Sequence, residues 1–176
     1  TDEPSVSVSF GSFLSVRGDV LGKVAAALRV ANVRAAIAYG SADIADLGDV
    51  PDHWLVGEFL PQVTLLGAAA LGVTHGGNNS VTEALTFGVP LVVLPFSTDQ
   101  FAGAEALERI GFGAALAPNE ATVAEIKIAI DSMLNLPEDA RRALHDLGAT
   151  LRAREGHHAL AGRVRPLNPI AEGTTQ

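Results

Sequence analysis

Short apolar runs alternate along the chain with segments whose apolar residues recur at helical spacing. Six of these runs are predicted strands, at residues 5–10, 33–39, 54–56, 71–74, 91–94 and 113–117. Glycine closes several of the runs, as Gly11 and Gly40 do, and glycine commonly ends a strand. Strands that alternate with helices form βαβ units. The pattern therefore predicts an α/β fold, a Rossmann-like doubly wound sheet of six parallel strands.

The segments between the strands have the spacing of amphipathic helices. The first has Asp19 where a capping residue is expected, followed by an apolar face of Val20, Val24, Leu28 and Ala31. Three more helices are predicted at residues 62–69, 80–87 and 99–110. Thr122 and Glu125 have the capping-box spacing and predict a fifth helix. A last helix, from about Glu138, is expected to pack through Ala140, Leu144, Leu147 and Leu151.

Composition narrows the class of protein. The 176 residues fit one domain. With 20 acidic and 12 basic residues the net charge is −8, which repels a phosphate backbone, so we expect no nucleic-acid partner. No cysteine is present, which leaves neither disulfides nor Cys-zinc sites. No apolar run approaches the ~20 residues of a membrane span, so none is expected.

The two ends differ in character from the centre. Residues 1–4 are acidic, unlike a signal peptide, and no initiating methionine precedes them. We expect a cytoplasmic protein piece with a linker remnant at 1–4, one folded domain at 5–162 and a loose arm at 163–176. The arm contains Pro166, Pro169 and Gly173.

Polar residues concentrate between positions 59 and 100, directly after predicted strands. The run from His75 to Ser80, HGGNNS, passes from a strand end into a helix start. Its two glycines let a ligand approach the backbone, and a helix N-terminus offers free N–H groups to a phosphate. Asn79, Ser80 and Glu83 share one helix face. These residues favour a diphosphate site, although neither GxxxxGK[ST] nor GxGxxG is present.

Each of these motifs also has a purely structural interpretation. The GGNN run also fits a tight turn, and Ser80 with Glu83 fits a capping box. The Gly11-Ser12 pair is either a turn or a second phosphate contact. Asp99 is either a helix cap or, with Gln100, a pair suited to sugar hydroxyls.

In order and spacing, the motifs resemble the donor-binding signature of the UDP-glycosyltransferase superfamily. The matching runs are FLPQ at 59–62, HGGNNS with Glu83, GVP at 88–90 and DQ at 99–100. The likeness extends from about Val6 to Gly113. It includes plant secondary-product enzymes and bacterial macrolide and antibiotic glycosyltransferases. The resemblance implies the C-terminal, donor-binding half of a GT-B fold.

The resemblance also implies a role for each matching residue. The diphosphate would meet Ser12, His75, Gly77, Asn79 and Ser80. The base and ribose would meet Phe59, Leu60, Gln62 and Glu83, and the sugar would meet Asp99 and Gln100. Neither a metal nor another cofactor is implied. Phenylalanine at position 59 and asparagine at position 78 replace two tryptophans of the plant pattern, so UDP-sugar and TDP-sugar donors both stay open.

A GT-B enzyme has a second, N-terminal domain that holds the acceptor and the general base. The resemblance therefore implies that this chain contains no catalytic residue, binds nucleotide and transfers nothing alone. The whole enzyme would invert the anomeric carbon of the sugar and pass it to a small molecule, with a natural product as one option.

Other function classes stay open at this point. A hydrolase would use Ser80 or Ser12 with His75 and Asp99, but the chain lacks the GxSxG elbow. A sugar-nucleotide epimerase or MurG-like transferase domain would share the sheet. A non-catalytic nucleotide-binding module would bind without a partner domain. The pair at 157–158, His-His, reads as an exposed helix end rather than as a metal site.

Overall fold

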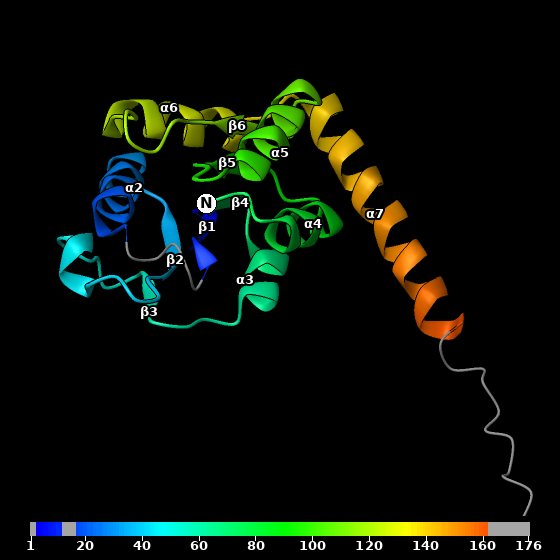
Figure 1. The fold of residues 1–176 in the computed structure, drawn as a ribbon, viewed down its shortest axis with the longest axis horizontal. Helices are drawn as coiled ribbons and strands as arrows, with labels where there is room; N and C mark the ends of the chain where they lie inside the picture. The colour runs from blue at the N-terminus through cyan, green and yellow to red at the C-terminus, as the bar shows by residue number, and fades with distance from the viewer. Residues whose placement is uncertain (1–2, 12–16, 162–176) are drawn as a thin grey trace, which may run out of the picture.

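The computed structural model describes residues 3–11 and 17–161, with side chains to residue 154. In this part of the chain six parallel strands form one sheet in the order β3-β2-β1-β4-β5-β6 (Figure 1). The strands are β1 (Ser5–Ser9), β2 (Arg34–Ala38), β3 (Leu55–Gly57), β4 (Leu71–Thr74), β5 (Leu91–Val93) and β6 (Gly113–Ala115). The predicted six-stranded, doubly wound sheet is thus confirmed, and its strand order reverses between β1 and β4.

Helices cover both faces of this sheet. They are α2 (Gly18–Ala31), η1 (Ile44–Leu47), α3 (Gln62–Ala68), α4 (Asn78–Phe87), α5 (Thr98–Arg109), α6 (Val123–Leu134) and α7 (Glu138–Ala161). Helices α2 and α6 pack on one face, where they form the larger core with β1 and β2. Helices α3, α4 and α5 pack on the other face against β4 and β5, in a second core. Helix α7 docks along α4 and then extends beyond the sheet (Figure 1).

Strand β1 separates an apolar face from a polar one. Val6 and Val8 are 1% exposed and belong to the core beneath α2 and α6. The alternate residues are serines, because successive side chains of a strand point to opposite faces. Ser5 donates to the carbonyl of Ala68 in α3, and Ser7 and Ser9 line a small hollow beside α3 and α4. Strand β1 is therefore polar on the side of α3 and α4.

The predicted helix cap at Asp19 is wrong, and neither Ser80 nor Asp99 occupies the capping position that its structural interpretation required. Helix α2 begins at Gly18, so Asp19 lies inside its first turn, where the carboxylate binds the Arg17 guanidinium instead. Helix α4 begins at Asn78, two residues before Ser80, and α5 begins at Thr98 rather than at Asp99. Side-chain hydrogen bonds join Asp19 to Arg17, Ser80 to Gln62 and Asp99 to Ser97.

Other local predictions hold or shift by a residue or two. The Thr122–Glu125 capping box is confirmed, and Leu144 of α7 is fully buried as expected. Trp54 lies just before β3, where it is 7% exposed and its indole N–H donates to the carbonyl of Val33 at 2.9 Å. Helix η1, capped by Asp43, falls between two predicted strands in a stretch for which the sequence predicts no helix.

In the part of the chain that the structure describes, no helix is both long and apolar enough to cross a bilayer. The arm at 163–176 and the first two residues of the linker remnant lie outside the described residues.

Candidate functional site

The reversal of strand order places two loops side by side at the carboxyl edge of the sheet. Gly11 follows β1, and His75 follows β4. A Cβ atom built on Gly11 would lie 3.1 Å from Cε1 of His75, so the imidazole packs directly against the backbone of Gly11. Doubly wound sheets bind their ligands at this reversal point. The histidine singled out in the sequence therefore lies where the fold predicts a ligand.

The two glycines after His75 serve different purposes. Gly76 has φ +86°, a left-handed conformation that favours glycine, and a Cβ there would lie 2.7 Å from Val93. Gly77 has an ordinary φ of −60°, but a Cβ there would lie 2.6 Å from Nε2 of His75. Gly76 makes the turn, and Gly77 leaves room for the imidazole.

The His75 imidazole is half-buried. Burial lowers its pKa below the ordinary 6.5, and the negative charge of Asp99 partly offsets this shift. The ring is therefore neutral at pH 7, with one N–H to donate. Its Nδ1 lies 3.5 Å from the hydroxyl of Thr74, a weak contact in which the donor depends on the tautomer. The imidazole therefore has only weak competition from other protein groups for the hydrogen bonds that it can make with a ligand.

The Asp99 carboxylate stays ionised at the same rim. A hydrogen bond from the Ser97 hydroxyl, at 2.6 Å, is the main cause of its lowered pKa, with backbone N–H groups and His75 adding to the effect. A carboxyl group held in this form accepts hydrogen bonds, as sugar hydroxyls require, and does not act as a general acid.

The N-terminus of α4 is open. Its N-cap residue is Gly77, no side chain caps the helix, and no acidic residue lies in the first turn. The first N–H groups of such a helix have no partner within it, and they carry a partial positive charge. The hollow in front of them is lined by His75, Gly77, Asn78, Asn79 and Ser80. Four of the five residues predicted to meet a diphosphate thus come together, while Ser12 lies outside the described residues.

The side chain of Gln62 joins helices α3 and α4 at this rim. The amide nitrogen of Gln62, the first residue of α3, lies 2.7 Å from a carboxylate oxygen of Glu83 and 3.2 Å from the hydroxyl oxygen of Ser80. Within the described residues, the hydroxyl of Ser80 is therefore paired with Gln62 and not with His75. This geometry does not favour a hydrolase that uses Ser80 as its nucleophile.

A second hollow adjoins the first at the ends of β1, β2 and β3. Phe59 is 74% exposed on its border and offers a free aromatic face, and Leu60 and Gln62 line the same hollow. Three of the four residues predicted to meet the base and ribose thus lie around one hollow, and the fourth, Glu83, is hydrogen-bonded to Gln62. Glu58 also lines it and was missed by the sequence analysis, although it follows a strand as the other polar site residues do.

The predicted sugar contacts divide into an exposed and a buried residue. Asp99 is exposed at the rim, whereas Gln100 is 9% exposed and its amide oxygen accepts the backbone N–H of Phe96 at 2.8 Å. Gln100 therefore also holds the loop between β5 and α5. Sugar binding by either residue stays a prediction.

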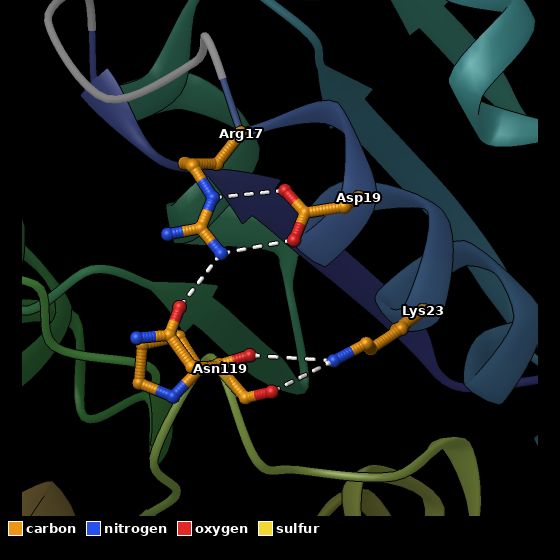
Figure 2. A network of polar contacts seen from close by, with 5 residues as sticks. Arg17, Asp19, Lys23 and Asn119 are labelled. Atoms are coloured by element: carbon orange, nitrogen blue, oxygen red, sulfur yellow. Dashed lines mark hydrogen bonds and ion pairs between the residues drawn. The ribbon is translucent and has the colours of Figure 1, made fainter.

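At the rim near the start of α2, the charged side chains bind partners within the protein. Figure 2 shows the Arg17 guanidinium bound to Asp19 and, at 2.7 Å, to the side-chain oxygen of Asn119. Lys23 reaches the backbone carbonyl of Asn119 at 3.5 Å. The guanidinium also lies 5.5 Å from the ring centre of Phe96. The guanidinium of Arg17 is thus bound by partners within the protein. Among the described residues, no three His, Asp or Glu side chains lie close enough together to hold a metal ion.

Comparison with known proteins bears on this site as well. Residues 23–154 match the family described as "Erythromycin biosynthesis protein CIII-like, C-terminal domain". YojK of Bacillus subtilis (strain 168), described as an uncharacterized UDP-glucosyltransferase, is 35% identical over 119 residues, which cover 68% of this chain and 29% of YojK. Oleandomycin glycosyltransferase of Streptomyces antibioticus is 36% identical over 98 residues, 56% of this chain and 23% of that protein.

A solved structure agrees with these matches. The calicheamicin glycosyltransferase superposes with a TM-score of 0.75 and 28% sequence identity, over 94% of this chain and 45% of that chain. The chain thus spans less than a third of the two curated relatives and less than half of the solved one.

Proposed function

Because this chain belongs to the erythromycin biosynthesis protein CIII-like C-terminal domain family, whose relatives are GT-B glycosyltransferases, we propose that it binds the nucleotide-sugar donor of such an enzyme. The observation that carries the proposal is the neutral imidazole of His75, held between Gly11 and Gly77 beside the open N-terminus of α4. An anionic diphosphate suits this position, since both the imidazole and the helix end present N–H donors.

The donor is a UDP-sugar or a TDP-sugar. Its base stacks on the exposed ring of Phe59, its ribose hydroxyls meet Glu83, and its sugar hydroxyls meet Asp99. Binding needs no metal, because the helix N-terminus and His75 supply the donors that the diphosphate requires.

In the full-length enzyme an N-terminal domain supplies the acceptor site and the general base. That base deprotonates the acceptor hydroxyl, which attacks the anomeric carbon from the face opposite the diphosphate and inverts it. His75 and the α4 N–H groups stabilise the charge that develops on the leaving diphosphate. The chain alone binds the donor and transfers no sugar. A small-molecule acceptor and a cytoplasmic location are further parts of this proposal.

Isothermal titration calorimetry with UDP and TDP tests the proposal. We expect the 176-residue chain to bind at least one of them with micromolar to millimolar affinity. Substitution His75→Ala should cost about 1–3 kcal/mol of binding free energy, the scale of a hydrogen bond to a charged group. His145→Ala is the matched control, because the side chain of His145 is 73% exposed on α7. Equal affinities in both variants would remove His75 from the site.

Calorimetry alone does not separate the remaining alternatives. A non-catalytic nucleotide-binding module and a MurG-like or epimerase domain would bind nucleotide as well. Sugar transfer by the chain joined to the remaining sequence of its open reading frame distinguishes a transferase, MurG-like ones included, from an epimerase and from a non-catalytic module.

A further inference from the structure

The side chain of Gln62 bridges two of the predicted nucleotide contacts, Ser80 and Glu83. We propose that Gln62 is a positioning residue, which fixes the hydrogen-bonding direction of Ser80 and Glu83 in the donor site. The inference rests on the proposed function, and it assigns Gln62 an action through its neighbours rather than through contact with the base.

The chemistry of the three groups sets the direction of each hydrogen bond. A carboxylate accepts only, so the group of Gln62 that faces Glu83 at 2.7 Å is its NH₂. The same nitrogen donates to the hydroxyl oxygen of Ser80 at 3.2 Å. Ser80 then keeps its own proton for a phosphate oxygen, and Glu83 keeps its second oxygen for a ribose hydroxyl. One amide thus leaves Ser80 a donor and Glu83 an acceptor.

Without this amide the two groups would satisfy each other. Ser80 and Glu83 lie three residues apart on α4, and residues at that spacing are neighbours on a helix. The Ser80 proton would turn toward the Glu83 carboxylate, the strongest acceptor within reach. Both groups would then lose the hydrogen-bonding capacity that a nucleotide needs.

The backbone around Gln62 is well suited to a fixed position. Pro61 precedes it with φ −70°, and Leu66, one turn later, is 5% exposed in the second core. Behind Gln62 lies the small hollow that Ser7 and Ser9 line, so its side chain stands between the polar face of β1 and the rim. Helix α3 therefore holds the amide against α4 from a rigid base.

A double-mutant cycle with UDP as the probe tests the inference. Gln62→Leu should weaken UDP binding about tenfold, because Ser80 and Glu83 lose their shared donor. In a Ser80→Ala/Glu83→Ala background the same substitution should change affinity less than twofold, since the groups through which it acts are gone. Titration followed by amide chemical shifts measures affinities up to the millimolar range. Thr64→Ala, an exposed position on the same helix, is the control.

Gln62→Glu separates positioning from packing. This variant keeps the shape of the side chain, so a residue that only fills space would leave affinity unchanged. A carboxylate cannot donate to Ser80 and repels Glu83, so positioning predicts a loss at least as large as that of Gln62→Leu. Thermal unfolding shows whether Gln62→Leu perturbs folding. If it does, Gln62→Glu still tests the inference.

Three results would overturn the inference. Equal losses for Gln62→Leu in both backgrounds would make Gln62 an independent contact of the nucleotide. Wild-type affinity in Gln62→Glu would reduce its role to packing. Absence of UDP and TDP binding by the unmodified chain would reject the proposed function and this inference with it, whereas the first two results leave the proposed function standing.

Discussion

Helices α4 and α6 begin in opposite ways. At α6 the Thr122 hydroxyl accepts the backbone N–H of Glu125 at 3.2 Å, and the Glu125 carboxylate accepts the backbone N–H of Thr122 at 2.8 Å. At α4 a glycine stands in the capping position, and no side chain satisfies the first N–H groups. Both helices follow a strand of the same sheet, so their place in the topology does not explain the difference.

The difference shows that the first N–H groups of a helix serve either the stability of the fold or the binding of a ligand. A capped end spends its N–H groups on the protein's own side chains and stabilises the fold. An open end leaves these groups for a ligand, and here His75 lies beside it. The charge of Arg17 is used like the N–H groups of a capped end, because Asp19 and Asn119 already bind its guanidinium within the protein (Figure 2). Substitutions at each place should therefore affect either binding or stability.

The largest effect is expected at the open end. Gly77→Ala places a Cβ atom 2.6 Å from Nε2 of His75, so the imidazole must leave its place against Gly11. We expect a loss of about 2–3 kcal/mol in UDP binding, since the displaced ring and the helix N–H groups both lose their contacts. Calorimetry measures the affinity, and denaturant unfolding should show a much smaller change in stability. Unaltered affinity would mean that the ligand does not need this ring.

The closed end should respond in the reverse sense. Thr122→Ala removes the hydroxyl that caps α6, which should lower the free energy of unfolding by about 1 kcal/mol. Affinity for UDP should stay at the wild-type value, because α6 lies away from the proposed site. Urea unfolding and calorimetry of the same preparation check both halves of this prediction. A drop in UDP affinity without loss of stability would contradict the division.

A glycine with open space around it provides the counterpart of Gly77. No atom lies within 4 Å of a Cβ built on Gly103, inside α5. Gly103→Ala should therefore raise the free energy of unfolding by roughly 0.5–1 kcal/mol, because alanine loses less conformational entropy in a helix. UDP affinity should not change. Destabilisation of this variant would show that α5 packs differently from the structure described here.

The smallest effect concerns pH. The pKa of His75 in the folded chain lies below its ordinary 6.5, so below pH 6.5 the unfolded chain binds the proton more readily. The contribution of His75 to stability is therefore complete above pH 6.5 and is lost as the pH falls toward the folded-state pKa. His75→Gln should flatten this part of the stability profile, measured by urea unfolding between pH 7.5 and 5.5. Identical profiles for the two proteins would contradict the burial of the ring.

Much of the fold follows from local pattern. Strand β4 (Leu71–Thr74) has its predicted bounds, because an apolar run in a parallel sheet is buried on both sides and ends where polar residues begin. The α6 cap was predicted for a similar reason, since its two partners are only three residues apart. Features that depend on neighbours in sequence are readable from the sequence.

Contacts between distant elements were not readable in this way. The Gln62–Glu83 hydrogen bond depends on how α3 lies beside α4, and Arg17 meets Asn119 across 102 positions. One local contact also escaped prediction: the Asp19 carboxylate binds the guanidinium of Arg17, two residues before it, and Asp19 lies inside the first turn of α2 rather than at its cap. The sequence identified His75 as a site residue. It did not predict that the imidazole packs between two glycines, Gly11 and Gly77, because that position results from the reversal of strand order in the sheet.

Amide chemical shifts of the isotope-labelled chain during titration with UDP test the central claim most directly, since they observe both helix ends at once. The account predicts the largest shifts at Gly77, Asn78 and Asn79, at the start of α4, and little change at Thr122 and Glu125. Shifts centred on α6, or a saturating titration that leaves the start of α4 unmoved, would contradict it.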